Sequence, residues 1–384
     1  MKCALITGAT GVVGSELVPL FLQADPWKVR LIIRADSPAH LSERFKELLA
    51  YWGMSPTDNR VVQKVEVFSG DVCQPELGLD SAVYNRLSKE VTHIIHCAGN
   101  VRLNQSLDDA RRDAVGSARR IVQFAHACQQ HGTLTKLDVL STIGVAGRMP
   151  GLIPERPLTE PREFHNTYEA AKAEAEDFLL GELDAGLPLT IHRPSMVVGN
   201  SQTGRIRQFQ VFYYLCEFLS GNKTMGIVVD TGDAVLDIIP VDYVAHALYI
   251  ASTQPDSVGK IFHLCSGPAH AIRLTDLSER LWRMAAARGE RPCRLRRLSP
   301  QSFSFLLWCV TRLSWGKTRR ELRTLPFFLS YLDEHQSFDT TIATRYFSGH
   351  HLAIDCSGYL DRVMTFYRAS KKRKSPQALA RGLL

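Results

Sequence analysis

The sequence lacks a membrane-spanning stretch, a paired-cysteine motif and a cluster of metal-binding side chains. Its best apolar run, FSFLLWCV at residues 303–310, is closed by Arg312 and is far shorter than the roughly 18 residues that a transmembrane helix needs. The nine cysteines are scattered without a CxxC pair, which excludes a disulfide framework and a zinc-finger spacing. Among 13 histidines only His350 and His351 are adjacent, without partners, so we expect no metal site.

Scattered, unpaired cysteines are typical of a reducing compartment. A strand expected to begin at Lys2 leaves no room for a signal peptide, so we expect a cytoplasmic protein. Peripheral membrane contact stays open because arginine and tryptophan flank the apolar run at 303–310.

Positive charge is concentrated in the last third of the chain. The net charge is +7, yet residues 273–325 hold thirteen arginines and lysines against four acids, and residues 368–384 hold six against none. A basic region beside an acidic body indicates a polyanionic partner, such as a nucleotide carrier, an acidic carrier protein or a membrane surface, or else a solvated face. No nucleic-acid recognition motif accompanies it, the oligomeric state is open, and we expect residues 368–384 to be a flexible tail.

The chain of 384 residues, 45% hydrophobic and 22% charged, is globular and too long for a single core. Short β-branched runs alternate with helical patterns up to residue 270, which predicts an α/β fold with a Rossmann-type, doubly wound parallel sheet. One long helix is expected at 107–131. A smaller, mainly helical substrate lobe is expected at 271–367, with a contribution from 195–235. The expected strands are 3–7, 29–34, 64–68, 92–97, 137–141, 189–193 and 261–265.

The stretch ITGATGVVG follows the first expected strand and opens a helix. Glycines at this junction allow a tight turn and let a pyrophosphate approach the backbone at the helix N-terminus. We therefore predict a dinucleotide site formed by Thr7, Gly8, Thr10, Gly11, Val12, Val13 and Gly14.

The end of the second strand carries Arg34, where an NAD-preferring site usually offers a carboxylate. A guanidinium suits a 2′-phosphate, and Arg44 on the next helix is a second candidate, so we predict NADPH as the cofactor. The other expected contacts follow the third and fourth strands: Asp71, Val72, Ala98, Gly99 and Asn100.

Three further side chains are expected at the same crevice. Thr142 follows the fifth strand, and Tyr168 and Lys172 lie four residues apart on a helix, which places them on one face. Hydride delivered to a carbonyl creates an oxyanion that needs a proton or oriented donors. We expect the Lys172 ammonium to lower the pKa of the Tyr168 phenol, and Thr142 to orient the carbonyl.

The chain resembles the extended short-chain dehydrogenase/reductases, and within them the thioester reductases, which include fatty acyl-CoA reductases and the reductase domains of carboxylic acid reductases and peptide synthetases. The resemblance covers residues 1–270 and rests on IIRADSPAHLSERFKELLAYW, GDVCQPELGLDSAVYNRL with VTHIIHCAGNV, YEAAKAEAE, IHRPSMVVGNSQTG and LDIIPVDYVAHAL. It implies a Thr142, Tyr168 and Lys172 triad, with Lys172 also bound to the nicotinamide ribose and Pro194 and Ser195 covering the nicotinamide.

One departure concerns the motif NVxGT, because this chain reads DAVGS with Asp113 in the usual Asn position. That Asn helps to hold a proton relay in the family, so the resemblance leaves the relay open here.

The resemblance implies an NADPH-dependent reductase of acyl thioesters, bound to CoA or a carrier protein, that yields an aldehyde or, after a second reduction, an alcohol. The alternatives are a dehydrogenase or epimerase of a sterol or nucleotide sugar, which shares the triad, and a non-catalytic NADP-binding scaffold. The segments FQVFYYLCEFL and FSFLLWCVTRLSW either line an acyl tunnel or form ordinary core helices, and the second is also a candidate membrane-surface helix.

Overall fold

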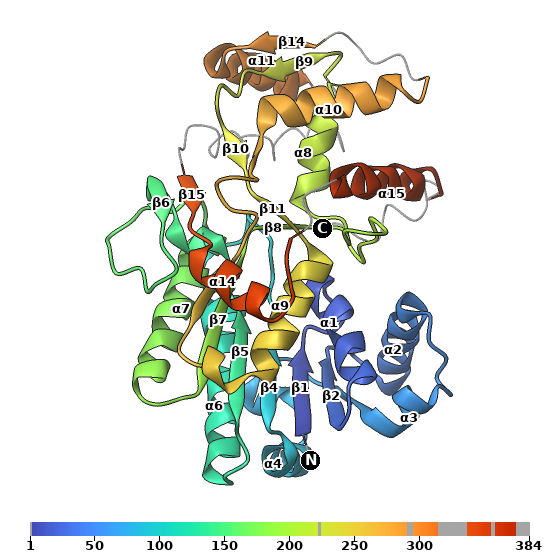
Figure 1. Cartoon of the computed structure of the whole chain (residues 1–384), viewed down its shortest axis with the longest axis vertical. Helices are drawn as coiled ribbons and strands as arrows, with labels where there is room; N and C mark the ends of the chain where they lie inside the picture. The colour runs from blue at the N-terminus through green and yellow to red at the C-terminus, as the bar shows by residue number, and fades with distance from the viewer. Residues whose placement is uncertain (1, 222–223, 290–294, 314–335, 355–357, 374–384) are drawn as a thin grey trace.

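The computed structural model describes residues 2–221, 224–289, 295–313, 336–354 and 358–373. Its centre is a seven-stranded sheet in the order β12-β7-β5-β4-β1-β2-β3, in which every pair is parallel (Figure 1). The strands are β1 Lys2–Thr7, β2 Trp27–Ile33, β3 Val65–Ser69, β4 His93–His96, β5 Lys136–Leu140, β7 Leu189–Pro194 and β12 Ile261–Leu264. All the expected strands are present, and the doubly wound α/β fold is confirmed.

The strand order indicates where a ligand would bind. β1 pairs with β2 on one side and with β4 on the other, so the connections after β1 and β4 leave toward opposite faces of the sheet. Open parallel sheets bind ligands where the order reverses, at the carboxyl ends of the strands. The loops that follow β1, β4 and β5 therefore meet at one edge.

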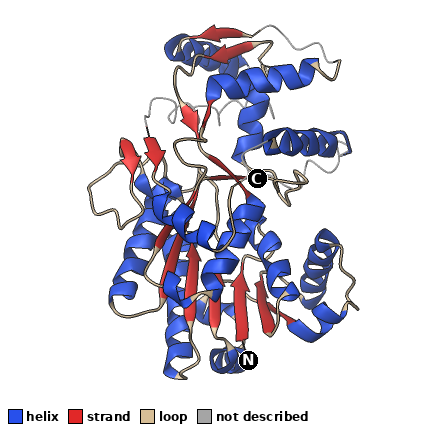
Figure 2. Cartoon of the chain, viewed as in Figure 1, coloured by secondary structure: helices blue, strands red, loops and turns tan. Residues whose placement is uncertain are grey.

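Helices cover both faces of the sheet (Figure 2). One face carries α1 Val12–Gln23, α2 Pro38–Trp52, α3 Asn59–Lys64 and α9 Val241–Thr253, and the other carries α4 Ser81–Glu90, α6 Ser117–Gln130 and α7 Thr167–Asp184. The helix expected at 107–131 is continuous but not uniform. It consists of α5 Leu107–Arg111, a π-helical turn at Arg112–Gly116, and α6.

A second lobe stands above the carboxyl edge of the sheet (Figure 1). In the part of the lobe that the structure describes, it is assembled from two-stranded sheets, namely β8 with β11, β9 with β14 and β10 with β13, and from four helices. Its elements are β8 Met196–Val198, α8 Val211–Leu219, β9 Ile227–Val229, β10 Val235–Leu236, β11 Ile238–Pro240, β13 Ile272–Arg273, α10 Leu274–Ala286, β14 Arg296–Leu298, α11 Pro300–Leu313 and α15 Tyr359–Arg373.

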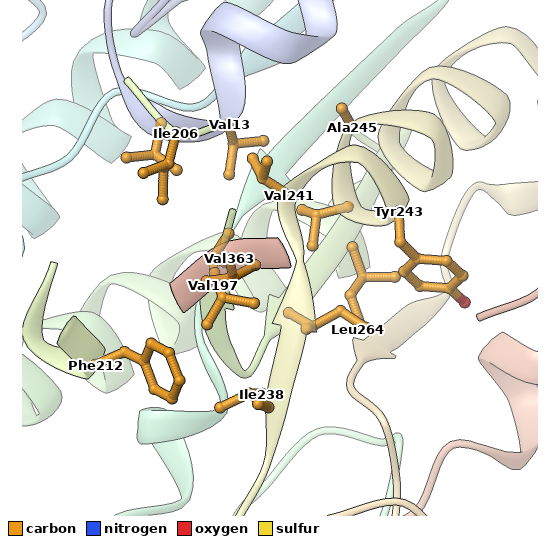
Figure 3. Packing of buried hydrophobic residues seen from close by; sticks show 14 of the residues in the cluster. Val13, Val197, Ile206, Phe212, Ile238, Val241, Tyr243, Ala245, Leu264 and Val363 are labelled. Carbon is orange, nitrogen blue, oxygen red and sulfur yellow. The ribbon is translucent and has the colours of Figure 1, made fainter. Parts of the chain in front are cut away.

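The lobe packs directly on the sheet domain through one continuous apolar core. Val13 of α1 and Tyr243 of α9 belong to the same buried cluster as Phe212 of α8 and Val363 of α15 (Figure 3). Because buried side chains of both parts share one cluster, side-chain packing helps to fix their relative position.

Residues 336–349 return to the sheet domain, although the expected lobe at 271–367 includes them. β15 Gln336–Phe338 pairs in parallel with β6 Gly151–Ile153, and α14 Thr341–Gly349 packs on β12. Buried Glu155 accepts backbone N–H groups from His263 at 2.8 Å, from Ile342 at 2.6 Å and from Ala343 at 3.1 Å. One carboxylate thus joins β12 to the first turn of α14.

The two apolar segments proposed for an acyl tunnel differ in burial. In α8 the side chains of Phe212, Tyr213 and Phe218 are buried, which supports the core-helix interpretation. In α11 Phe303 is buried against Phe218, whereas Phe305 and Trp308 are exposed. Among the described helices, none combines the length and the apolar character that a membrane crossing requires. Of the flexible tail expected at 368–384, residues 368–373 belong instead to helix α15. Residues 374–384 and residues 314–335, with the TLPFFLSYL segment at 324–332, lie outside the described residues.

Candidate active site

The glycine-rich loop packs so closely that side chains cannot replace its glycines. Gly8 has φ +73°, and a Cβ there would lie 2.6 Å from the backbone nitrogen of Ala98. A Cβ on Gly14 would lie 2.3 Å from the Gly8 carbonyl oxygen. The amide of Gly11 donates to the Gly8 carbonyl at 2.8 Å and α1 begins at the next residue. Backbone rather than side chain therefore faces the crevice, which fits a bound pyrophosphate.

The neighbours of Gly8 in the motif have supporting positions. The Thr7 hydroxyl is hydrogen-bonded to His96 Nδ1 at 2.8 Å and accepts the Ala98 amide at 3.3 Å, so it ties the end of β1 to the end of β4. Val12 and Val13 are buried in the core. Any contact that these three residues make with a dinucleotide is therefore a backbone contact.

The two arginines predicted for a 2′-phosphate lie together beside the glycine-rich loop. Arg44 donates through Nη2 to the Thr10 hydroxyl at 3.0 Å and through Nη1 to the carbonyl of Arg34. The Arg34 side chain is 76% exposed, with its Nη1 3.9 Å from Asp71 Oδ2. A guanidinium this exposed is free to turn toward a phosphate.

The other predicted cofactor contacts are placed at the same edge. Asp71 accepts the Cys73 amide at 3.0 Å and Val72 is half-buried beside it. A Cβ on Gly99 would lie 3.6 Å from the Lys172 ammonium, so a side chain there would fill the space in front of it. The Asn100 amide group is already engaged, donating to Asp113 at 2.9 Å and to Gln105 at 3.2 Å.

Thr142, Tyr168 and Lys172 meet at the carboxyl end of β5. Asn166 caps α7 by accepting the Glu169 amide at 3.0 Å, which sets Tyr168 in the first turn and Lys172 one turn later. Tyr168 is hydrogen-bonded to Thr142, and Lys172 Nζ donates to the Leu140 carbonyl at 3.2 Å. All three side chains are partly exposed, as residues that line a crevice must be.

The acidity of the triad differs from the expectation. Burial raises the pKa of Tyr168 to about 12, while the hydrogen bond with Thr142 lowers it and nearby Glu169 raises it. The expected lowering by Lys172 is wrong for this arrangement, because loss of hydration outweighs the other influences. Burial also lowers the pKa of Lys172, opposed by the charge of Glu176.

A buried ion pair that the sequence prediction missed joins the elements that carry the triad. The Arg193 guanidinium, fully buried at the end of β7, donates through Nε to Glu176 at 3.0 Å, and Glu176 accepts the Ser141 hydroxyl at 2.5 Å. Ser141 precedes Thr142, and Glu176 lies one turn beyond Lys172. The pair therefore locks the relative positions of β5, β7 and α7. An arginine inside the apolar strand LTIHRP is the signal that would have revealed it, since a buried charge requires a partner.

Pro194 and Ser195 follow Arg193 at the crevice edge. Pro194 pairs with Leu264 in the sheet, and the Ser195 amide donates to the Leu264 carbonyl at 3.1 Å. Both are buried, and they connect β7 to β8.

The fold and this crevice define a dinucleotide-binding reductase of the short-chain dehydrogenase/reductase type. A family model described as "Male sterility protein", an NAD-binding family, matches residues 6–248. The chain therefore belongs to this family, whose members include the thioester reductases of the extended superfamily.

Curated relatives match about 70% of this chain. An "Isonitrile lipopeptide synthase" of Streptomyces coeruleorubidus is 29% identical over 278 residues, which is 71% of this chain and 18% of that protein. An Arabidopsis thaliana protein named "Probable fatty acyl-CoA reductase 5" is 24% identical over 347 residues, covering 72% of this chain and 69% of that protein. The chain thus corresponds to less than a fifth of the synthase.

Solved structures share the fold over nearly the whole chain. The terminal R domain from the myxalamid PKS-NRPS pathway has a TM-score of 0.78 at 24% identity, covering 98% of this chain and 92% of that one. A thiolation-reductase di-domain from an archaeal non-ribosomal peptide synthetase has a TM-score of 0.77 at 18% identity. The match covers 97% of this chain and 76% of that one. These likenesses establish the architecture of both lobes.

Proposed function

We propose that the protein is an NADPH-dependent reductase that converts an acyl thioester to an aldehyde and a free thiol. The observation that carries the proposal is the convergence of Thr142, Tyr168 and Lys172 beside Gly99, at the edge where the glycine-rich loop binds a dinucleotide. The glycine cradle and the arginines beside Thr10 fit NADPH.

When bound, NADPH supplies a hydride to the thioester carbonyl carbon. The chain's own groups act on the oxygen of that carbonyl. Tyr168, with its pKa raised to about 12, stays protonated at neutral pH and donates a hydrogen bond or proton to the oxygen as negative charge develops. Thr142 orients the same oxygen, and the Lys172 ammonium stabilises the charge and holds the ribose.

The hemithioacetal formed in this way has its proton from Tyr168 and its hydrogen from the cofactor. Its C–S bond then breaks to give the aldehyde, and the sulfur leaves as a thiol after taking a proton from the hydroxyl by way of solvent. The net reaction consumes one thioester, one NADPH and one proton. A second hydride transfer to the aldehyde would give an alcohol by the same groups.

The substrate is proposed to be carried by CoA or by a carrier protein, both of which are anionic. The similar proteins include one named "Probable fatty acyl-CoA reductase 5" and a thiolation-reductase di-domain. The lobe presents exposed arginines at Arg283, Arg296 and Arg312. Complementary charge would steer such a carrier toward the crevice.

The test is NADPH oxidation with acyl-CoA and acyl-carrier substrates of several lengths, with products identified by mass spectrometry. A panel of ketosteroids and UDP-sugars tests the dehydrogenase and epimerase alternatives. Aldehyde or alcohol formed only from thioesters supports the proposal. Turnover of a sterol or sugar but no thioester contradicts it, and tight NADPH binding without any turnover would indicate a scaffold. Carrier-dependent activity should also fall as ionic strength rises.

A further inference from the structure

Two arginines from separate elements contact Thr10 of the glycine-rich loop, and the carbonyl of a third, Arg34, accepts a hydrogen bond from one of them. Arg34 follows β2, Arg44 lies on α2, and Arg207 lies in the segment 199–210 that joins β8 to α8 of the lobe. Arg44 binds the Thr10 hydroxyl at 3.0 Å, while Arg207 donates through Nε to the Thr10 carbonyl at 3.0 Å. Thr10 is thus contacted on both of its oxygens by guanidinium groups that come from opposite sides.

The acids that pair with this cluster, Glu47 and Asp71, are partly exposed and lie at N–O distances of 3.4 and 3.9 Å, so each pair is loose. Arg207 is only 16% exposed, yet its partner Glu47 is 61% exposed with an N–O distance of 3.4 Å. Arg34 is paired only loosely with Asp71, at 3.9 Å. Burial, then the charges of Arg34 and Arg207, lower the pKa of Arg44, while the charges of Glu47 and Asp36 raise it. Such a cluster is complementary to a doubly charged phosphate.

The position of Arg207 is set by its neighbours in the chain. Ile206 is 5% exposed and belongs to the core that also contains Val13, where Figure 3 shows both side chains. Arg205 lies over the Tyr51 ring, 4.4 Å from its centre, and donates to the Tyr51 carbonyl. Alternate residues therefore face the core and the surface of α2, and Arg207 is held at the nucleotide loop rather than left in solvent.

We propose that Arg207 is a third arginine of the 2′-phosphate site, so that the phosphate of NADPH bridges the dinucleotide domain and the 199–210 segment of the lobe. The inference rests on the proposed use of NADPH and deepens it. Because α8 begins at Val211, the same phosphate ties the base of the substrate lobe to the cofactor. Selectivity for NADPH over NADH then depends on both lobes rather than on the end of β2 alone.

The experiment compares two small probes that lack nicotinamide, adenosine 2′,5′-bisphosphate and adenosine 5′-monophosphate, by isothermal titration calorimetry on the full chain. Arg207→Gln should weaken the bisphosphate about tenfold or more, while the monophosphate changes less than about twofold. Loss of one charge-assisted phosphate contact corresponds to that factor. Arg207→Lys keeps the positive charge but loses the planar guanidinium group. Its affinity for the bisphosphate should lie between those of the wild-type protein and Arg207→Gln.

Arg205→Gln is the matched control, because it removes an arginine from the same segment and leaves the cluster intact. We expect it to leave the ratio of the two affinities within about twofold of wild type. Equal weakening of both probes by Arg207→Gln, or no change in either, would overturn the inference, since the residue would then act only on the backbone. A wild-type protein without preference for the bisphosphate would overturn both the inference and the NADPH proposal. A protein that reduces no thioester yet shows the Arg207 effect would retain the inference and lose only the function.

Discussion

Tyr168 is the proton donor of the proposed reaction. Its pKa of about 12 keeps the phenol neutral throughout the physiological range, and Thr142 holds it by a hydrogen bond. The Lys172 ammonium donates to the Leu140 carbonyl, and a Cβ on Gly99 would lie 3.6 Å from it. In the proposed reaction its charge would act on the ribose and the developing oxyanion rather than ionise the phenol.

Removal of the Tyr168 hydroxyl should abolish most of the activity while leaving binding intact. For Tyr168→Phe we expect kcat to fall by roughly 10²–10⁴, the usual contribution of a positioned proton donor. Steady-state kinetics with an acyl-CoA measure the loss, and the Kd for NADPH and the melting temperature serve as controls. Turnover within about twofold of wild type would show that another group protonates the oxygen.

Arg34 should set cofactor preference without affecting the chemistry. For Arg34→Ala we expect the ratio of kcat/KM for NADPH to that for NADH to fall about tenfold or more, mostly through KM, because a charge-assisted phosphate contact is lost. Parallel kinetics with the two cofactors provide the measurement. Equal efficiency with both cofactors in the wild-type protein would already contradict the prediction.

Asp113 tests whether the departure from the family motif limits the rate. Its Oδ2 accepts the Asn100 amide at 2.9 Å, and its Oδ1 lies 3.3 Å from the Arg112 guanidinium. Asp113→Asn keeps an oxygen for Asn100 and loses only an ion pair with half-exposed Arg112, which is worth little. We expect kcat to change less than about twofold. A severalfold rise in kcat would mean that the acid impedes a proton relay.

At the scale of secondary-structure elements, the crevice depends on contacts that fasten one element to another. The Arg193–Glu176 pair holds α7 against β7, and Glu155 holds α14 against β12. Both acids are buried and accept hydrogen bonds from neighbouring elements. A substitution at either residue would therefore disturb two elements at once.

Loss of the Glu155 carboxylate should destabilise the fold more than it affects the chemistry. For Glu155→Ala we expect unfolding to become easier by about 2 kcal/mol or more, because the amides of His263, Ile342 and Ala343 lose their acceptor. The melting temperature should fall by roughly 5 °C. Glu160→Ala, which removes an exposed acid bound to Arg156, is the control and should change it little.

Across the whole molecule, buried neutral histidines should make stability depend on acid. Burial lowers the pKa of His93 and His263 to about 4 and that of His96 to about 3. The unfolded chain binds their protons first, so their contribution is present above pH 6.5 and is lost as pH falls toward these values. Glu155 acts in the opposite sense, since burial raises its pKa to about 7 and its contribution is lost as pH rises through that value.

Burial also lowers the pKa of His192, and it raises the pKa of Asp177 and of Asp237, which opposes the histidines. Because four histidines act against three carboxyls, we expect the melting temperature to fall by roughly 5 °C between pH 7 and pH 5. Thermal unfolding monitored by circular dichroism at several pH values measures the slope. His96→Asn offers a polar group to the Thr7 hydroxyl but takes up no proton. It should therefore reduce the dependence of the melting temperature on pH by about the contribution of one histidine. An unchanged slope would mean that these rings are not responsible.

The sequence by itself determined the sheet strands, the glycine-rich loop and the positions of the catalytic candidates, because strand periodicity and glycine geometry are local properties. Gly8, Thr142, Tyr168 and Lys172 all lie at the crevice where the order of strands and motifs placed them. The π-helical turn within the helix at 107–131 was not predictable, since its apolar stripe continues through it.

Only the tertiary structure decided what depends on residues far apart in the chain. Arg193 finds Glu176, Arg207 reaches Thr10 across 197 positions, and residues 336–349 return from the lobe to β6 and β12. The acidity of Tyr168 belongs to the same group, because desolvation reflects everything that packs around a side chain. Local sequence specifies backbone geometry, whereas burial and long-range charge pairing exist only once the chain has folded.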